Sequence, residues 1–201
     1  MSDATEHIDH EGKTMGMWFF LFTEILFFGG MFLLYAAYRF KYAAAFHAAA
    51  AEENLVLGTV NTAILLTSSL AIALAIWALR AGKTTWSIAL QAATVAMGVA
   101  FLVIKYVEWS GKISHGIYPD SPALLALGHG QTMFFGLYYM MTGLHGLHVL
   151  VGCVVICIMI YFTGRGVIDQ ARGVRLANTG LYWHFVDIVW LYLYPLFYLI
   201  T

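Results

Sequence analysis

Ionisable side chains stand inside stretches of this chain that are otherwise apolar enough to cross a lipid bilayer. His184 and Asp187 lie near the middle of Leu181–Tyr198, and Glu24 lies within Met15–Tyr38. Such groups can take up and release protons, but burying one at that depth disfavours insertion by roughly 2.5–3.5 kcal/mol. Another helix or a wet cavity normally offsets this penalty, so these residues predict helix faces that turn toward protein. His184 and Asp187 are three apart and share a helical face.

Glu24 is the only charged residue of the first apolar run. With a helix that begins near Met15, it lies about nine residues in, or roughly 14 Å at 1.5 Å per residue. That depth is near the middle of a bilayer whose hydrocarbon core is about 30 Å thick. Two interpretations stay open: a carboxylate that handles protons, and a protonated or hydrogen-bonded carboxyl that fixes helix packing.

The run TGLHGLHVLVG, residues 142–152, combines small and hydrogen-bonding side chains. Gly143 and Gly146 predict the close approach of another helix. Three side chains are candidates for hydrogen bonds across that contact: Thr142, His145 and His148.

A metal or haem site on His145 and His148 is the alternative interpretation of this run. Such a site needs further ligands and hydrogen-bond acceptors around them. The remaining intramembrane candidates are scattered along the chain: His129, His184, Glu24 and Asp187. We therefore predict structural histidines and no metal bound by this chain.

Two further polar groupings occur within apolar runs. Lys105 and Glu108 are three apart near the end of one run, a spacing that favours a local ion pair, and Lys105 could also extend to the lipid headgroups. We predict an interfacial ion pair. The second run carries a polar stripe, which predicts hydrogen bonding between helices: Asn61, Thr62, Thr67, Ser68 and Ser69.

Composition places the chain among membrane proteins. Of its 201 residues, 61% are hydrophobic and 10% are charged, whereas a soluble domain carries about 25% charged residues. The net charge of -1 excludes a strongly basic nucleic-acid surface. Cys153 and Cys157 lie four apart in an apolar run, where small core residues are expected and not a disulfide. The chain shows no phosphate loop, CxxC pair, nucleophile elbow or zinc-hydrolase helix, and so no complete active site.

Five apolar runs reach the length of about 20 residues that a membrane-spanning helix needs. They cover about 15–38, 57–79, 84–107, 128–162 and 176–201. Residues 1–14 form a polar N-terminal segment without the pattern of a signal peptide. We predict an all-α bundle of five transmembrane helices in one domain, residues 15–201. Arg39–Val56 predicts a surface helix or an extension of the first span, Ser110–Leu127 an irregular loop, and Pro195 a late kink or the end of the last regular helix.

The basic residues predict an orientation. Six would lie on one side of the membrane: Lys13, Arg80, Lys83, Arg165, Arg172 and Arg175. Four would lie on the other: Arg39, Lys41, Lys105 and Lys112. The larger group marks the cytoplasmic side, so we expect a cytoplasmic N-terminus and a periplasmic C-terminus.

At these residues the chain resembles subunit III of the haem-copper respiratory oxidases, the cytochrome c oxidase type. The resemblance covers nearly all of the chain after residue 15. It is carried by YWHFVDIVW at 182–190, by TGLHGLHVLVG at 142–152, by TEILFF around Glu24, by NTAILL from Asn61, and by Glu108 with its following aromatic residue.

The resemblance implies a non-catalytic subunit in a bacterial inner membrane. It would pack beside the catalytic subunit I, with subunit II and small subunits nearby, bind phospholipid, and support proton uptake and turnover stability. Haem and copper would sit in the partner subunits. Glu24 would be the intramembrane carboxylate near proton entry, and Glu108, His148 and Asp187 would be buried polar positions. Many members have two further helices that form one arm of a lipid-filled cleft; here that arm would be absent or supplied by another subunit.

Two other functions remain as alternatives. One is an accessory subunit of a nitric oxide reductase or a quinol oxidase. The other is an independent proton-coupled transporter, for which inverted repeats or broken helices would be expected and neither is found.

Overall fold

The computed structural model describes residues 2–170 and 173–199, and this part of the chain is helical apart from short links. The helices are α1 (Ser2–Lys41), α2 (Ala43–Ala50), α3 (Leu55–Arg80), α4 (Thr84–Ser114), α5 (Pro122–Ala126), α6 (His129–Gly164) and α7 (Val174–Tyr194). A π-helical turn, η1 (Pro195–Leu199), continues α7. The all-α prediction is confirmed.

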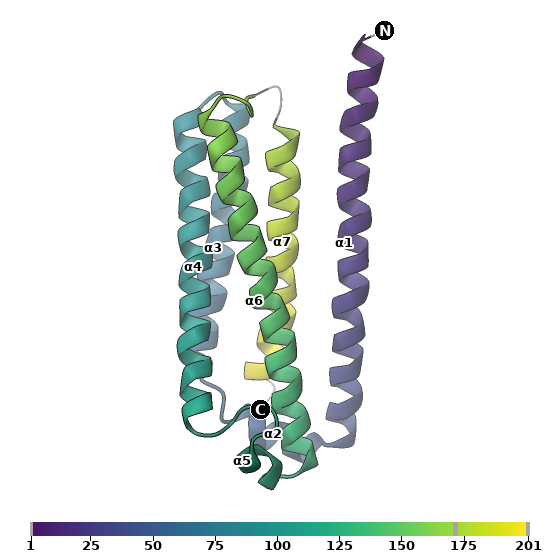
Figure 1. The fold of residues 1–201 in the computed structure, drawn as a ribbon, viewed down its shortest axis with the longest axis vertical. Helices are drawn as coiled ribbons and strands as arrows, with labels where there is room; N and C mark the ends of the chain where they lie inside the picture. The colour runs from purple at the N-terminus through teal and green to yellow at the C-terminus, as the bar shows by residue number, and fades with distance from the viewer. Residues whose placement is uncertain (1, 171–172, 200–201) are drawn as a thin grey trace.

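Four long helices, α3, α4, α6 and α7, form an up-and-down bundle, and α1 runs along its side against α6 and α7 (Figure 1). The short helices α2 and α5 lie at the end of the bundle where η1 also lies (Figure 1). In this arrangement α1 is an outer helix that packs on the bundle through α6 and α7.

Four segments of the described residues are long and apolar enough to cross a membrane: Thr14–Lys41, Leu55–Arg80, Thr84–Ser114 and His129–Gly164. The fifth predicted span, α7, is not among them, because its tryptophans, tyrosines, His184 and Asp187 lower the mean hydropathy. It has 21 residues, about 30 Å at 1.5 Å per residue, and it runs beside the other four (Figure 1). The transmembrane course of α7 stays a prediction, supported by its length and position.

Helix ends differ from the predicted spans where polar residues continue a helix. The polar N-terminal segment is the first part of α1, which begins at Ser2, and α4 continues past residue 107 to Ser114. Pro195 ends the regular part of α7, as predicted, because its ring removes a backbone donor. Helix boundaries read from apolar length alone stop where polar side chains begin, although the backbone hydrogen bonds continue.

The links between helices are more ordered than the sequence predicts. Of the two alternatives for the Ala-rich link, the separate helix is correct: α2 is set off from α1 at Tyr42, whose φ of −124° and ψ of 42° are not helical. The predicted irregular loop after residue 110 contains α5, which begins with a hydrogen bond from the Leu124 N–H to the Ser121 hydroxyl and with Pro122 in its first turn.

Basic residues occur at both ends of the bundle. The α3–α4 turn with Arg80 and Lys83 lies at the end where α1 begins, and Arg39 and Lys41 finish α1 at the other end (Figure 1). Arg172 lies outside the described residues.

Trp183 is buried in the bundle, and its ring packs closely against two glycines. A Cβ added to Gly152 would lie 2.8 Å from the Trp183 ring, and one added to Gly98 would lie 2.8 Å from the same ring and 2.6 Å from the Cys153 sulfur. The close approach that the sequence predicts at Gly146 is wrong, because a Cβ there would meet only Leu102, at an ordinary 3.8 Å.

The remaining small residues for which the sequence predicts close packing are Gly143, Cys153 and Cys157, and not all of them are buried. A Cβ on Gly143 would lie 3.0 Å from the Trp109 ring, so this glycine is in a tight contact. Cys153 and Cys157 are both free thiols; Cys153 is buried as expected, whereas Cys157 is exposed on the outer side of α6.

Candidate functional site

Glu24 and His148 form a pair that joins α1 to α6. The carboxyl Oε2 of Glu24 lies 3.1 Å from Nε2 of His148, and Nδ1 of the same ring lies 2.7 Å from the carbonyl of Leu144. Because a carbonyl only accepts, Nδ1 carries a proton and donates to it. The Nε2 side therefore holds either a neutral imidazole facing a carboxylic acid or an imidazolium facing a carboxylate. A hydrogen bond between Nε2 and Oε2 therefore needs a proton on one of these two atoms.

This pair lies on the flank of the bundle and not in its core. The side chains of His148 and Glu24 are 17% and 19% exposed. The position of the histidine is held by neighbours, since the Tyr182 hydroxyl donates to its carbonyl and the Phe28 ring packs edge-on against the imidazole. The sequence predicts both residues as intramembrane polar groups, and the structure brings them together.

His145 is separated from His148 although the two are three apart in the chain. It is fully buried, its ring lies between Phe101 and Trp190, and neither of its nitrogens has a hydrogen-bond partner among the described residues. The imidazoles therefore do not converge on a common ligand. Within residues 2–170 and 173–199, no group of three or more His, Cys, Asp or Glu side chains is placed to hold a metal ion.

Several predicted contacts of the same run are wrong. The Thr142 hydroxyl bonds to the Tyr138 carbonyl of its own helix instead of a neighbouring helix, and His145 bonds to nothing across the contact. His129 is the first residue of α6, and its side chain is exposed. Among the described residues, His148 is the one of the three candidates for interhelical bonds that bonds to another helix.

The polar stripe of α3 bonds to another helix, as predicted, and that helix is α7. Trp190 and Trp183 donate their indole N–H groups to Thr62 and Ser68, each at 3.0 Å. The hydroxyl of Ser69 lies 2.6 Å from Nδ1 of His184. Since an indole N–H buried without an acceptor is costly, these bonds select how α7 docks on α3.

Other residues of these two helices behave differently. The Thr67 hydroxyl bonds within α3 to Ala63. Asn61 is fully buried and Asp187 is 5% exposed. In the described part of the chain, the amide oxygen and nitrogen of Asn61 have no hydrogen-bond partner. Oδ1 of Asp187 has none either. Asp187 thus faces protein, as predicted, and it hydrogen-bonds to Ser69, whose hydroxyl also lies beside Nδ1 of His184.

Replacing Ser68 with alanine should lower the free energy of unfolding by about 1–3 kcal/mol, because the Trp183 indole N–H would lose its acceptor inside the core. Thermal unfolding of the purified membrane complex measures this loss. Thr67→Ala is the matched control, since its neighbouring hydroxyl is exposed and bonds only within its helix. Equal stability of the Ser68→Ala and Thr67→Ala variants would contradict the prediction.

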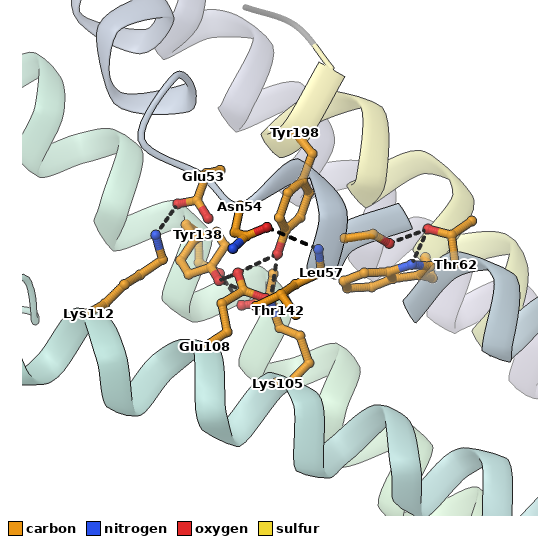
Figure 2. A network of polar contacts seen from close by, with 12 residues as sticks. Glu53, Asn54, Leu57, Thr62, Lys105, Glu108, Lys112, Tyr138, Thr142 and Tyr198 are labelled. Atoms are coloured by element: carbon orange, nitrogen blue, oxygen red, sulfur yellow. Dashed lines mark hydrogen bonds and ion pairs between the residues drawn. The ribbon is translucent and has the colours of Figure 1, made fainter. Parts of the chain in front are cut away.

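Lys105 and Glu108 form a buried ion pair, with Nζ and Oε2 3.2 Å apart. Lys105 also donates to the hydroxyls of Tyr138 and Tyr198, at 2.9 and 2.8 Å. Each hydroxyl donates in turn to Oε1 of Glu108, at 2.5 and 2.6 Å. Figure 2 shows both tyrosines pointing at the ends of the Lys105 and Glu108 side chains.

The predicted pair is therefore confirmed, and it is buried within the protein. The side chains of Lys105 and Glu108 are 8% and 3% exposed, because α6 and η1 cover this face of α4. Lys105 does not extend to the headgroups. Its ammonium lies within 5.5 Å of the Trp190 ring centre, a further favourable contact for a cation.

Glu53, which the sequence does not single out, extends this cluster into the α2–α3 link. Its Oε1 lies 2.8 Å from Nζ of Lys112, and its side chain is 0% exposed. Burial raises the pKa of Glu53 to about 7, and the ammonium of Lys112 opposes that rise. The signal in the sequence is the spacing of buried Phe46, Ala50 and Glu53, which continues the inner face of α2 by one turn.

A comparison with known protein families shows the family of the chain. The family described as Cytochrome c oxidase subunit III matches residues 2–201. The chain belongs to the cytochrome c oxidase subunit III family. Its resemblance to that family is thereby confirmed, and it is a multi-pass membrane protein associated with a haem-copper oxidase complex.

Individual relatives of this subunit III chain carry two kinds of name. The chain is 32% identical over 201 residues to Cytochrome c oxidase subunit 3 of Thermostichus vulcanus, covering 98% of this chain and 91% of the relative. It is 31% identical over 208 residues to Probable quinol oxidase subunit 3 of Staphylococcus epidermidis, and 32% identical to the protein of that name in Staphylococcus aureus. Both matches cover 100% of this chain and 97% of the relative.

Proposed function

We propose that this chain is the non-catalytic subunit III of a proton-translocating haem-copper terminal oxidase in a bacterial cytoplasmic membrane. It packs beside the catalytic subunit I, with subunit II in the same complex. Haem and copper belong to those partners. The observation that carries this proposal is the contact of 3.1 Å between Glu24 and His148 on the flank of the bundle, in a chain that the family matches over residues 2–201.

The pair supports proton uptake by its position. Nδ1 of His148 is committed to the Leu144 carbonyl, so a proton can enter or leave only on the side of Nε2 and the Glu24 carboxyl. Within the apolar segment Thr14–Lys41 of α1, Glu24 lies in the half nearer Thr14. With the N-terminus cytoplasmic and the C-terminus periplasmic, as the basic residues favour, that half is on the side from which the oxidase takes up protons.

The outer surface of α1 supports contact with lipid and with another subunit. A groove of about 430 Å³ separates α1 from α7 and is lined by apolar side chains such as Phe28, Phe185 and Tyr192. Trp18 and Phe22 on α1 are 58% exposed. Phospholipid acyl chains and an apolar face of subunit I match such a surface in chemistry.

Replacing Glu24 with glutamine should slow proton uptake and shorten the number of turnovers before the oxidase inactivates, because the amide cannot exchange a proton with His148. Turnover rate, proton-pumping stoichiometry and turnover lifetime of the purified complex measure the effect. Glu52→Gln, which changes an exposed carboxyl, is the control. Unchanged rate, stoichiometry and lifetime in the Glu24→Gln complex would leave this carboxyl with a packing role only.

A quinol oxidase is the second candidate, because two of the relatives carry that name. The electron donor binds elsewhere in the complex, so both candidates give this chain the same role. Oxidation of reduced cytochrome c or of a quinol by the purified complex decides between them.

A further inference from the structure

Four charged side chains meet at the end of the bundle where η1 lies, far along α6 from the Glu24–His148 pair. Glu53 and Lys112 form one ion pair, and Lys105 and Glu108 form the other. Figure 2 shows the two pairs side by side, with Tyr138 between them. With all four groups ionised, this four-charge cluster carries no net charge.

The two carboxyl groups of the cluster receive different numbers of hydrogen bonds from the protein. Glu108 accepts from Lys105 and from two tyrosine hydroxyls. Glu53 faces one ammonium, and its Oε2 has no hydrogen-bond partner in the described part of the chain although it is buried. A buried carboxylate with few donors is the less stable anion. A proton that reaches the cluster is therefore held on Glu53.

We propose that the four-charge cluster is a proton-binding site that exchanges one proton, on the carboxyl of Glu53, with the water at this end of the membrane. The proton leaves a hydronium ion or a buffer acid and bonds to a carboxylate oxygen of Glu53. Lys112 keeps its three protons and loses its counter-charge, so the cluster changes from neutral to +1. Lys112, 11% exposed, gives the cluster its contact with the outside.

The electrostatic surroundings support exchange near neutral pH. Burial raises the pKa of Glu53 to about 7, the cations Lys112 and Lys105 lower it, and the anion Glu108 raises it. The groups that face Glu53 come from three elements: Lys105, Glu108 and Lys112 on α4, Tyr138 and Tyr139 on α6, and Tyr198 on η1.

The proposal also predicts how stability depends on pH. The pKa of Glu53 is higher in the folded chain, about 7, than its ordinary value of 4.5, so the folded state binds more protons between these values. The stabilising contribution of Glu53 is complete below the lower value and is lost as the pH rises through the higher one. Glu53→Gln should flatten this fall in stability.

Infrared difference spectra of the purified complex, recorded on either side of neutral pH, test the site directly and do not depend on oxidase activity. We expect one carboxylic acid C=O band that titrates near neutral pH, that is absent in Glu53→Gln, and that is unchanged in Glu52→Gln. Lys112→Met, which keeps Glu53, should raise the midpoint by about one pH unit or more, because it removes the nearest cation. A band that persists in Glu53→Gln, a midpoint that Lys112→Met leaves in place, or no band titrating in this range would overturn the proposal.

Discussion

Replacing Glu108 with leucine should lower the free energy of unfolding by about 3–5 kcal/mol, which is a large share of the stability of a typical domain. The change leaves the ammonium of Lys105 buried, at 8% side-chain exposure, without its counter-charge. Two tyrosine hydroxyls remain near it, but they do not neutralise a cation. Thermal unfolding of the purified complex, and the amount of this chain that stays in it, measure the effect.

The double variant Lys105→Met/Glu108→Leu is the decisive control. Replacing a buried ion pair with apolar residues of similar size is often neutral or stabilising, so the double variant should recover most of the loss. Lys105→Gln should be the milder single change, since Glu108 keeps both tyrosine donors. If the double variant is as unstable as Glu108→Leu, the loss comes from the cavity or the tyrosines and not from the unpaired charge.

Replacing Gly152 with alanine should destabilise the bundle by about 1–3 kcal/mol through overpacking. The new Cβ would lie 2.8 Å from the Trp183 ring, and Gly98 stands equally close to the same ring. The indole cannot retreat without also losing its bond to Ser68. Thermal unfolding of the variant complex gives the measurement.

Gly136, on the same helix, provides the matched control for this substitution. A Cβ there meets nothing within 4 Å, so Gly136→Ala should leave stability unchanged or raise it slightly through helix propensity. A Gly152→Ala complex as stable as the Gly136→Ala complex would show that Trp183 has room to move.

The length of the apolar runs predicts most of the fold, because the hydrocarbon core of a bilayer demands helices of a narrow range of lengths. It does not predict that α1 starts at Ser2 or that α2 stands apart from it at Tyr42. Those features depend on backbone hydrogen bonding among polar residues, which hydropathy does not register.

The candidate site also has a part that the sequence predicts and a part that it does not. Glu24 and His148 are recognisable as costly residues in apolar runs, but their contact joins positions 124 residues apart, and spacing within one helix says nothing about such a pair. Glu53 is harder to find, because it follows Glu52 in one polar link and only the packing of α2 distinguishes the buried carboxyl from the exposed one.

Tyr198 reaches Lys105 across 93 positions of sequence, and this separation sets an order of events during biosynthesis. At about 5–20 residues per second, ribosomes need roughly 5–20 s to make that stretch. Until this stretch is complete, the Lys105–Glu108 pair of α4 lacks the hydroxyl of Tyr198, and for the first part of the interval it also lacks that of Tyr138. The hydrogen bonds of the Lys105–Glu108 pair are therefore completed only after η1 has been made and has packed against α4.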